Sequence, residues 1–232
     1  MDLYALHSLF ASLPLTPGQL GVVWLGVAAA YVIFGVAGFG TALVAGPLLA
    51  LFVPVPTIVP MLALLDFFAA GTNVIRDGRS ADMGEVKRLL PLMAAGSLIG
   101  ACILLLGRPA LLQMGLGMFA IGYAIYIFSG YKSDVRLEPV AAVPFGVVGG
   151  IFSALFGSGG FIFSIYLTGR LQTPTSIRIT TSTLIGAATL LRAAIFTIAG
   201  VYANRSILLL ALILFPAMLI GTSVGRRITL RL

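Results

Sequence analysis

The feature that most constrains this chain is a run from Leu3 to Leu65 that contains no Asp, Glu, Lys or Arg. Further uncharged runs follow at 89–107, 109–131, 139–169, 179–191, 193–204 and 206–225. Hydrophobic residues make up 59% of the chain and charged residues only 9%, whereas soluble domains carry roughly 25% charged residues. With about 20 residues needed for each helical span, the chain has room for about seven to nine segments. The sequence therefore predicts an all-α polytopic membrane protein.

The remaining composition excludes several other classes of protein. The net charge of +7 fits basic loops beside a membrane, because no contiguous basic segment is long enough to follow the phosphates of a nucleic acid. Cys102 is the single cysteine, so the sequence offers no intrachain disulfide and no Cys-rich metal site. The start, MDLYALHS, lacks the basic region of a signal peptide. We expect one transmembrane domain over residues 1–232, with no metal, no cofactor and no nucleic-acid partner.

Two glycine motifs occur in the same order in both halves of the chain. Gly38-Phe39-Gly40 is matched by Gly157-Ser158-Gly159-Gly160 in the second half. Further along, Pro91-x4-Gly96-x3-Gly100 is matched by Pro216-x4-Gly221-x3-Gly225. Glycine and proline are frequent in membrane helices, but the shared order favours an internal repeat. For the second pair of motifs, close helix packing through small residues is the favoured role.

The boundaries of the two repeats follow from the polar linkers. We expect a first repeat at about 18–106, a connecting helix at about 109–129 and a second repeat at about 139–227, after the polar segment GYKSDVRLEP. The connecting helix would invert the second repeat relative to the first. Each repeat would begin with a glycine-broken helical hairpin and continue with transmembrane helices. Inverted repeats with broken helices are an architecture of secondary transporters.

The positive charges predict the orientation. If each glycine-broken segment enters and leaves the membrane, the loops on one side carry eleven basic residues: Arg76, Arg79, Lys87, Arg88, Lys132, Arg136, Arg170, Arg178, Arg226, Arg227 and Arg231. The other side carries two, Arg108 and Arg205, and Arg192 remains inside a span. Because basic loops stay in the cytoplasm, we expect a cytoplasmic C-terminus and an external N-terminus in the cytoplasmic (inner) membrane.

The glycine breaks themselves predict a binding site. Irregular backbone at membrane depth is tolerated only where protein or a water-filled cavity covers it. A helix that restarts after Gly40, or after Gly160, would present free N–H groups and the positive end of its dipole. Two such starts that meet near the midplane would form a pocket suited to an anion.

The two glycine-rich stretches, GVAGFGTALVAGPLLALFVPVP and GGIFSALFGSGGFIFSIYL, resemble the signatures of the TauE/SafE family of sulfite exporters and sulfonate permeases. The resemblance extends from about Gly21 to Arg227. It implies a secondary membrane transporter of small sulfur-containing anions such as sulfite, sulfoacetate or related organosulfonates, by alternating access. The chain departs from the family pattern at Phe161, which interrupts the second glycine run and could alter the shape of the pocket.

Polar residues inside the spans complete the candidate site. On a helix expected at about 174–199, Thr181, Ser182, Thr189 and Arg192 fall on one side. Arg192 lies deep in this span, where an Arg costs about 3 kcal/mol unless it is paired or hydrated. Its planar fork would suit two oxygens of a sulfite or sulfonate. A structural ion pair, or a side chain that reaches the membrane surface, remains an alternative for Arg192.

Asp66 lies in the middle of a helix expected at 57–76, with Asn73 on about the same face. Its carboxylate could carry a proton coupled to transport, or it could neutralise Arg192. Asn73 corresponds in position to Arg192 when the glycine breaks are superposed, so its amide could donate to the same ligand. The predicted substrate-binding set is therefore Gly38, Phe39, Gly40, Gly157, Ser158, Gly159, Gly160, Asn73, Thr181, Ser182 and Arg192.

Other functions remain open on the sequence alone. An intramembrane enzyme with Ser158 as nucleophile would need a base within hydrogen-bond reach, and the only histidine, His7, precedes the first span. We therefore expect no enzyme. An anion channel, or a transporter of a carboxylate or thiosulfate, is an alternative. Beyond the anion and the lipid bilayer, exposed small-residue faces are compatible with a homodimer.

The charge distribution makes a direct prediction of topology. In a variant with Cys102 replaced by Ala, single cysteines at Ser80 and Ser133 should be shielded from an impermeant thiol reagent in intact cells. A cysteine at Asn204 should react, because Asn204 lies beside the basic-poor loop. Labelling of all three positions, or of Ser80 alone, would contradict the inverted arrangement.

Overall fold

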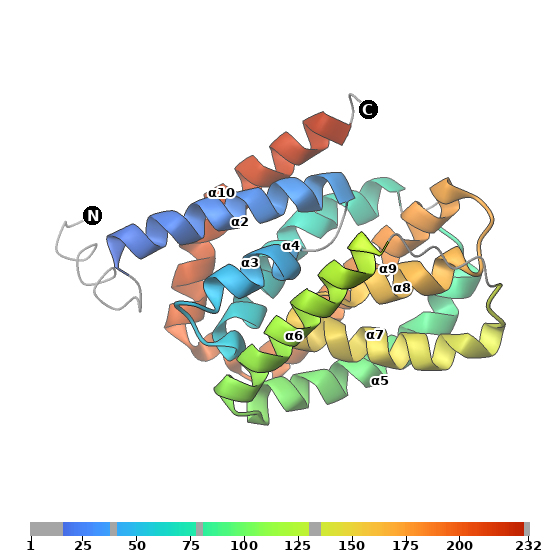
Figure 1. Cartoon of the computed structure of the whole chain (residues 1–232), viewed down its shortest axis with the longest axis horizontal. Coiled ribbons are helices and arrows are strands. Elements are labelled where there is room, and N and C mark those ends of the chain that lie inside the picture. Colours follow the sequence, from blue (N-terminus) through green and yellow to red (C-terminus); the bar gives the residue numbers. More distant parts are fainter. Residues whose placement is uncertain (1–15, 38–40, 78–80, 130–135, 230–232) are drawn as a thin grey trace.

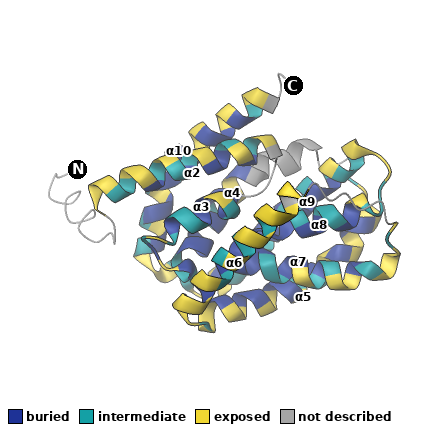
Figure 2. Ribbon diagram, viewed as in Figure 1, coloured by how far each residue is buried: buried dark blue, intermediate teal, exposed yellow. Residues whose placement is uncertain are grey.

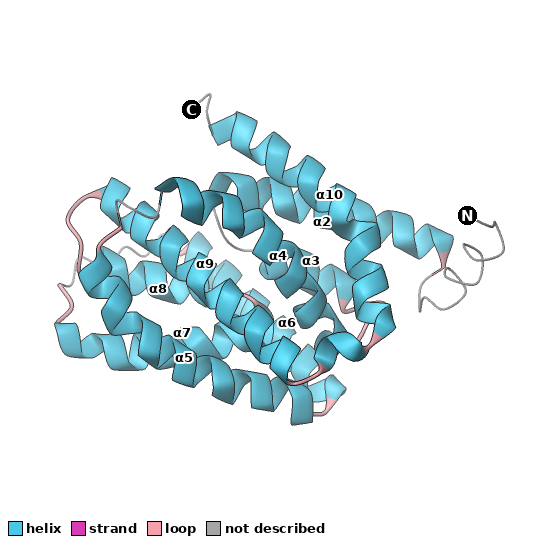
Figure 3. Ribbon diagram, turned by 180° about the vertical axis from the view of Figure 1, so that it is seen from behind, coloured by secondary structure: helices cyan, strands magenta, loops and turns pink. Residues whose placement is uncertain are grey.

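The computed structural model describes residues 16–37, 41–77, 81–129 and 136–229, and within them the chain is helical with no strand (Figure 3). The long elements, with their bounds, are α2 (Pro17–Ala37), α3 (Thr41–Leu49), α4 (Val55–Asp77), α5 (Met83–Leu106), α6 (Pro109–Phe128), α7 (Ala142–Phe156), α8 (Gly159–Thr168), α9 (Pro174–Ile198) and α10 (Arg205–Thr229). Short 3-10 turns precede α7 and α10, at Pro139–Ala141 and Val201–Ala203.

Six helical segments in the described ranges are long and apolar enough to cross a membrane, and two shorter apolar helices accompany them. The six lie in α2, α5, α6, α9 and α10 and in Pro139–Phe156, which includes α7; the shorter ones are Val55–Ala69 of α4 and the whole of α8. The prediction of an all-α, multi-pass membrane protein is therefore confirmed.

Most predicted boundaries agree with the structure, and two do not. The helix expected at about 109–129 is α6, and the one expected at about 174–199 is α9. The helix expected at 57–76 is α4, which begins earlier, at Val55, and carries Pro60 inside. Proline fits the first helical turn and costs one hydrogen bond further in. The second helix restart is also earlier than expected, at Gly159 and not after Gly160.

Two helix pairs flank the centre of the molecule (Figure 1). Helix α5 packs along α7, and α10 packs along α2, so in each pair a helix from one half of the chain contacts a helix from the other half. Between the pairs, α4 and α9 contact each other, and α4 also touches α10 while α9 touches α5. The core is therefore built from interleaved halves, and α4 and α9 lie at its middle.

The Pro-x4-Gly-x3-Gly motifs provide the close contacts of both pairs. A Cβ at Gly96 would collide with the carbonyl of Val147 on α7, and one at Gly100 would lie 3.0 Å from the Cβ of Ala154. On the other pair, a Cβ at Gly221 would lie 2.7 Å from the Cβ of Tyr31 and would also collide with a carbonyl of α2. The predicted packing role of these glycines is confirmed. Their absent side chains let the backbones approach.

At one end of the bundle, the carboxylate of Glu85 connects α5 to α8 and to the loop after it. At the right of Figure 1, α5 begins next to the end of α8 and the start of α9. Glu85 accepts hydrogen bonds from Arg88 at 2.6 Å, from Arg170 at 2.8 and 3.0 Å, and from the Tyr166 hydroxyl at 2.7 Å. Asp82 caps α5, and its backbone N–H donates to the Thr180 hydroxyl of α9 at 3.0 Å. This network joins α5 to α8 and α9.

Helix α6 is the least buried of the candidate spans, with 11% of its apolar window inside the structure. Figure 2 shows it with mostly exposed and intermediate residues. Its backbone comes closest to α3 and α4, and its Phe119 ring packs against aromatic rings of α7 and α8. Gln113 donates to the carbonyl of Ala50 at 2.9 Å. Its outward face is apolar, which suits contact with lipid.

The glycine contacts predict a stability difference between chemically identical substitutions. Gly96→Ala or Gly221→Ala forces a methyl group against a neighbouring backbone, so each should lower the free energy of unfolding by roughly 1–3 kcal/mol, the cost of overpacking. The measurement is thermal unfolding in detergent. The control is Gly117→Ala on α6, where a Cβ meets nothing within 4 Å; it should leave the melting temperature unchanged or raise it. Equal melting temperatures for all three variants would contradict the packing role.

Candidate functional site

The break between α7 and α8 is built from glycine. Helix α7 ends at Phe156, and Gly157 follows with φ 66°, in the left-handed region that glycine adopts at little cost. Its N–H donates to the carbonyl of Ser153 at 2.9 Å, and the Ser158 N–H donates to that of Phe152 at 3.3 Å. These bonds close the last turn of α7. Helix α8 then starts at Gly159 and runs back in a new direction.

This break leaves no room for side chains. A Cβ at Gly157 would lie 2.7 Å from Nη1 of Arg192 and 2.9 Å from the Cβ of Ala42 on α3. A Cβ at Gly159 would lie 2.8 Å from the Cβ of Ser153 and would collide with the carbonyl of Gly149. The glycines therefore let α7, α3 and α9 meet at the start of α8.

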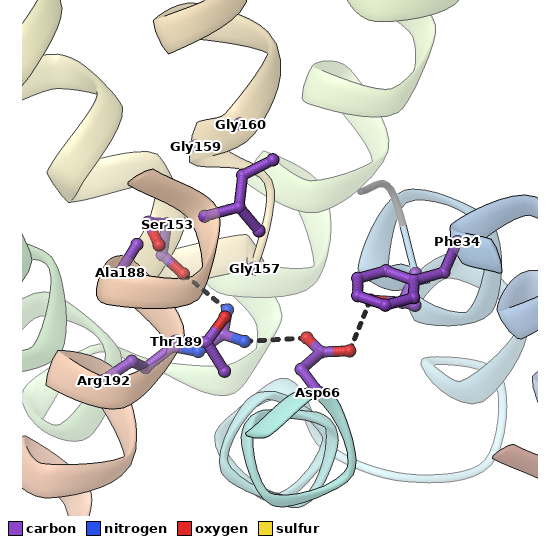
Figure 4. A pocket seen from close by; sticks show the side chains of 11 residues that line it. Phe34, Asp66, Ser153, Gly157, Gly159, Gly160, Ala188, Thr189 and Arg192 are labelled. Atoms are coloured by element: carbon purple, nitrogen blue, oxygen red, sulfur yellow. Dashed lines mark hydrogen bonds and ion pairs between the residues drawn. The ribbon is translucent and has the colours of Figure 1, made fainter. Parts of the chain in front are cut away.

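A buried ion pair crosses between the two halves of the chain at this point. Nη2 of Arg192 on α9 donates to Oδ2 of Asp66 on α4 at 2.8 Å (Figure 4). The side chains are 2% and 5% exposed. Nη1 of Arg192 donates to the carbonyl of Ser153, near the end of α7, at 2.9 Å. Arg192 is thus held by α4 and by the glycine break together.

Asp66 has two further donors on its other oxygen. Oδ1 accepts from the hydroxyl of Tyr31 on α2 at 2.8 Å and from the hydroxyl of Thr41 at 2.9 Å. Thr41 is the first residue of α3, directly after the first glycine motif. Both residues are buried. The carboxylate therefore joins α2, α3 and α9 around α4, and three donors compensate its charge.

One nitrogen of the guanidinium has no hydrogen-bond partner. Nε of Arg192 is buried and has no hydrogen-bond partner among the described residues. An unsatisfied buried donor on a charged group costs more than about 1–3 kcal/mol. The two other such atoms in the described part are the hydroxyls of Thr181 and Thr222. A buried cation with a spare donor is a site at which an anion's oxygen could be accommodated.

A small cavity adjoins this ion pair and the start of α8. Its lining combines the ion pair, the glycine break and residues of α2, α3 and α9: Phe34, Thr41, Asp66, Ser153, Gly157, Gly159, Gly160, Ile185, Ala188, Thr189 and Arg192. Figure 4 shows Gly157 beside the guanidinium, with Gly159 and Gly160 further along the same part of the chain. The first N–H groups of a helix have no acceptor within the helix, and the dipole there favours negative charge.

The structure brings together part of the predicted set. Gly157, Gly159, Gly160 and Arg192 line the cavity, as does Asp66, which the sequence suggested as a partner of Arg192 or a proton carrier. The structure contains the ion pair between Asp66 and Arg192 that the sequence offered as one alternative. Gly38, Phe39 and Gly40 lie outside the described residues. Asn73 belongs to α4, in a stretch whose side chains are not described.

Three residues of the predicted binding set, and Phe161, lie outside the cavity lining. The Ser158 hydroxyl donates to the carbonyl of Phe156 at 3.0 Å, so the described contacts give it no base. Thr181 is buried and Ser182 half-buried on α9, but only the later part of their stripe lines the cavity. Phe161 packs against Phe119 and Tyr123 of α6, with ring centroids 5.6 and 5.0 Å apart, and so shapes that contact.

Sequence reasoning missed Tyr31, Thr41 and Ser153. Tyr31 is one of several aromatic residues in apolar spans, and Ser153 contributes only its backbone carbonyl to Arg192. Neither carries a pattern that marks it. Thr41 offered a signal, because it directly follows Gly40 at the expected helix start. Within the described ranges, no three His, Cys, Asp or Glu side chains come close enough to hold a metal ion.

Comparison with known proteins supports one family. The sequence model of the family described as sulfite exporter TauE/SafE matches residues 22–232, nearly the whole chain. No curated protein and no solved structure matches the chain. The match includes both glycine motifs and every residue that lines the cavity. The chain therefore belongs to the TauE/SafE family of sulfite exporters, which are membrane transporters.

Proposed function

We propose that this protein is a secondary transporter of small sulfur-containing anions, sulfite, sulfoacetate or related organosulfonates, and that the anion binds at the glycine break between α7 and α8. The observation that carries the proposal is the buried guanidinium of Arg192, which has a spare Nε–H and borders a cavity at the start of α8. Family membership supports transport of a sulfur-containing anion.

The chemistry of the lining suits such an anion. Sulfite and sulfonate groups each present three oxygens around sulfur, and two of them can accept from one guanidinium edge. A further oxygen could accept from the first N–H groups of α8, at Gly159 and Gly160, which line the cavity. The hydroxyls of Thr41 and Thr189 also border the space.

Alternating access is supported by the interleaved packing. We propose that residues 18–106 and 139–227 are inverted repeats joined by α6. On this reading, α3 and α8 are equivalent half-helices that follow equivalent glycine motifs. The pairs α5–α7 and α2–α10 then exchange helices between repeats in the same way. Most residues that line the cavity are buried, and we propose that an anion enters when one repeat moves relative to the other.

We further propose that the protein lies in the cytoplasmic membrane with its C-terminus inside, since the expected topology places most basic residues in loops on one side. An anion channel, or a carrier for a carboxylate or thiosulfate, is the alternative. Influx into proteoliposomes that saturates with sulfite and is inhibited by an organosulfonate supports the carrier. Flux that rises linearly with the gradient, or preference for acetate over sulfite, contradicts it.

The glycine break predicts that a side chain at Gly157 weakens anion binding, in addition to lowering the free energy of unfolding. Gly157→Ala strains a left-handed residue and places a methyl group against Arg192, so sulfite affinity should fall at least tenfold. The control is Gly200→Ala, where φ is 70° but a Cβ meets nothing within 4 Å. Both variants should lose roughly 1 kcal/mol of stability from the backbone. Isothermal titration with sulfite distinguishes them, and equal affinities would exclude the break from the site.

Arg192 predicts a second difference in affinity. Arg192→Lys keeps the charge but loses the planar fork, so anion binding should weaken by roughly 1–3 kcal/mol, the scale of a charge-assisted hydrogen bond. Arg192→Ala should weaken it further, although removing one partner of a buried pair also costs about 3–5 kcal/mol of stability. Arg178→Lys, an exposed position on the same helix, is the control and should bind as wild type. Wild-type affinity in a folded Arg192→Lys protein would contradict this role.

A further inference from the structure

The cavity already contains balanced charge before any anion enters. Asp66 and Arg192 are the only ionisable side chains among its described lining residues, and they form an ion pair. An anion that bound beside this pair would bring the site to a net charge of −1. In an apolar interior such a charge is costly unless another group compensates it.

The ion pair uses only one of the two nitrogens on the Nε–Nη2 edge of the guanidinium. Nε and Nη2 lie on the same edge of Arg192, the edge that binds two oxygens of a carboxylate or oxyanion side-on. Asp66 takes only Nη2, at 2.8 Å, and Nε has no partner among the described residues. An anion that bound Nε and Nη2 together would share Nη2 with the carboxylate of Asp66, and the repulsion between the two negative charges favours release of Nη2 by Asp66.

The contacts of Asp66 show how that release can occur. Oδ1 accepts from Tyr31 and Thr41, and Oδ2 accepts from Arg192. A proton on Oδ2 would leave both Oδ1 contacts in place and would weaken the bond to Nη2, since a neutral oxygen is a poorer acceptor for a guanidinium. The new O–H could itself donate to the anion.

Asp66 is the one carboxylate among the described residues that line the cavity. Of the ionisable groups next to α4, Tyr202 donates its hydroxyl proton to the carbonyl of Pro60 at 3.1 Å. Tyr31 on α2, Thr41 on α3 and Arg192 on α9 are the described side chains that bond to Asp66, and only Tyr31 and Arg192 are ionisable. The helices α5 and α10 also touch α4, but the acidic residue of α5, Glu85, is bound to Arg88 and Arg170. Arg226 of α10 donates to the carbonyl of Ala69 at 3.2 Å. In α6 and α7, the described ionisable residues are tyrosines alone, Tyr123 and Tyr126 on α6.

We propose that Asp66 takes a proton from water as the anion binds, so that one anion and one proton occupy the site together and cross the membrane without net charge. This inference rests on the proposed anion site. The proton binds Oδ2, the Nη2–H to Oδ2 hydrogen bond is replaced by Nη2–H to anion, and Nε–H takes a second anion oxygen. Because like charges repel, the anion favours the proton and the proton favours the anion by the same factor.

The test counts protons during binding. Methanesulfonate is the probe, because its sulfonate stays ionised and any proton taken up must bind the protein. Isothermal titration of the purified full-length chain in two amine buffers with different ionisation enthalpies should show uptake of about one proton per anion. Asp66→Asn should bind methanesulfonate with no proton uptake. Glu85→Gln removes the other buried, Arg-paired acid and is the control, with uptake as in wild type.

A second measurement does not depend on any variant. If one proton accompanies each anion, the affinity of the wild-type protein for methanesulfonate should fall about tenfold for each unit of pH above neutrality. A pH-independent affinity, zero proton uptake by wild type, or unchanged uptake in Asp66→Asn would overturn the coupling. If wild type binds neither methanesulfonate nor sulfite, the proposed anion site itself is wrong, and the coupling fails with it.

Discussion

The ion pair between Asp66 and Arg192 is the interaction on which the centre of this structure depends. It joins α4 to α9, the two helices at the middle of the molecule, and through Tyr31, Thr41 and the carbonyl of Ser153 it also fixes α2, α3 and α7. Removing a single partner would leave an uncompensated charge in an apolar interior. A pair of this kind contributes little net stability, but it specifies which helices meet and in what register.

The glycine break makes that pair sterically possible. Arg192 can reach Ser153 only because Gly157 carries no Cβ, and Gly157 can turn the chain only because it adopts a positive φ. The same residue therefore ends α7, orients α8 and makes room for the guanidinium. The arrangement places the positive ends of a helix and of a side chain beside one carboxylate, which accounts for the close balance of charge at the cavity.

Much of the fold could be read from the sequence because the bilayer imposes strong rules. Uncharged runs of the right length predicted the spans, and the positions of Gly96, Gly100, Gly221 and Gly225 predicted close helix contacts. Arg192 was singled out because a charge inside a span needs a partner. Its partner Asp66 was visible for the same reason.

The other residues around the ion pair could not be predicted, because their roles depend on distances between helices that the sequence does not contain. Tyr31 and Thr41 have side chains that many apolar helices carry, and their role arises only where α2 and α3 converge on α4. The backbone carbonyl of Ser153 has no signature in the residue type at all. The α4 boundary was misjudged because proline is compatible with a first helical turn as well as with a loop.

The exposure of α6 has a consequence for how the protein responds to the thickness of the lipid bilayer. With 20 residues it is about 30 Å long, which equals the thickness of a typical hydrocarbon layer. Because so little of it is covered by other helices, acyl chains supply most of its surroundings, and a thinner or thicker bilayer would tilt it before it disturbed the buried helices. Lipid chain length thus acts first on the segment that connects the two halves of the chain.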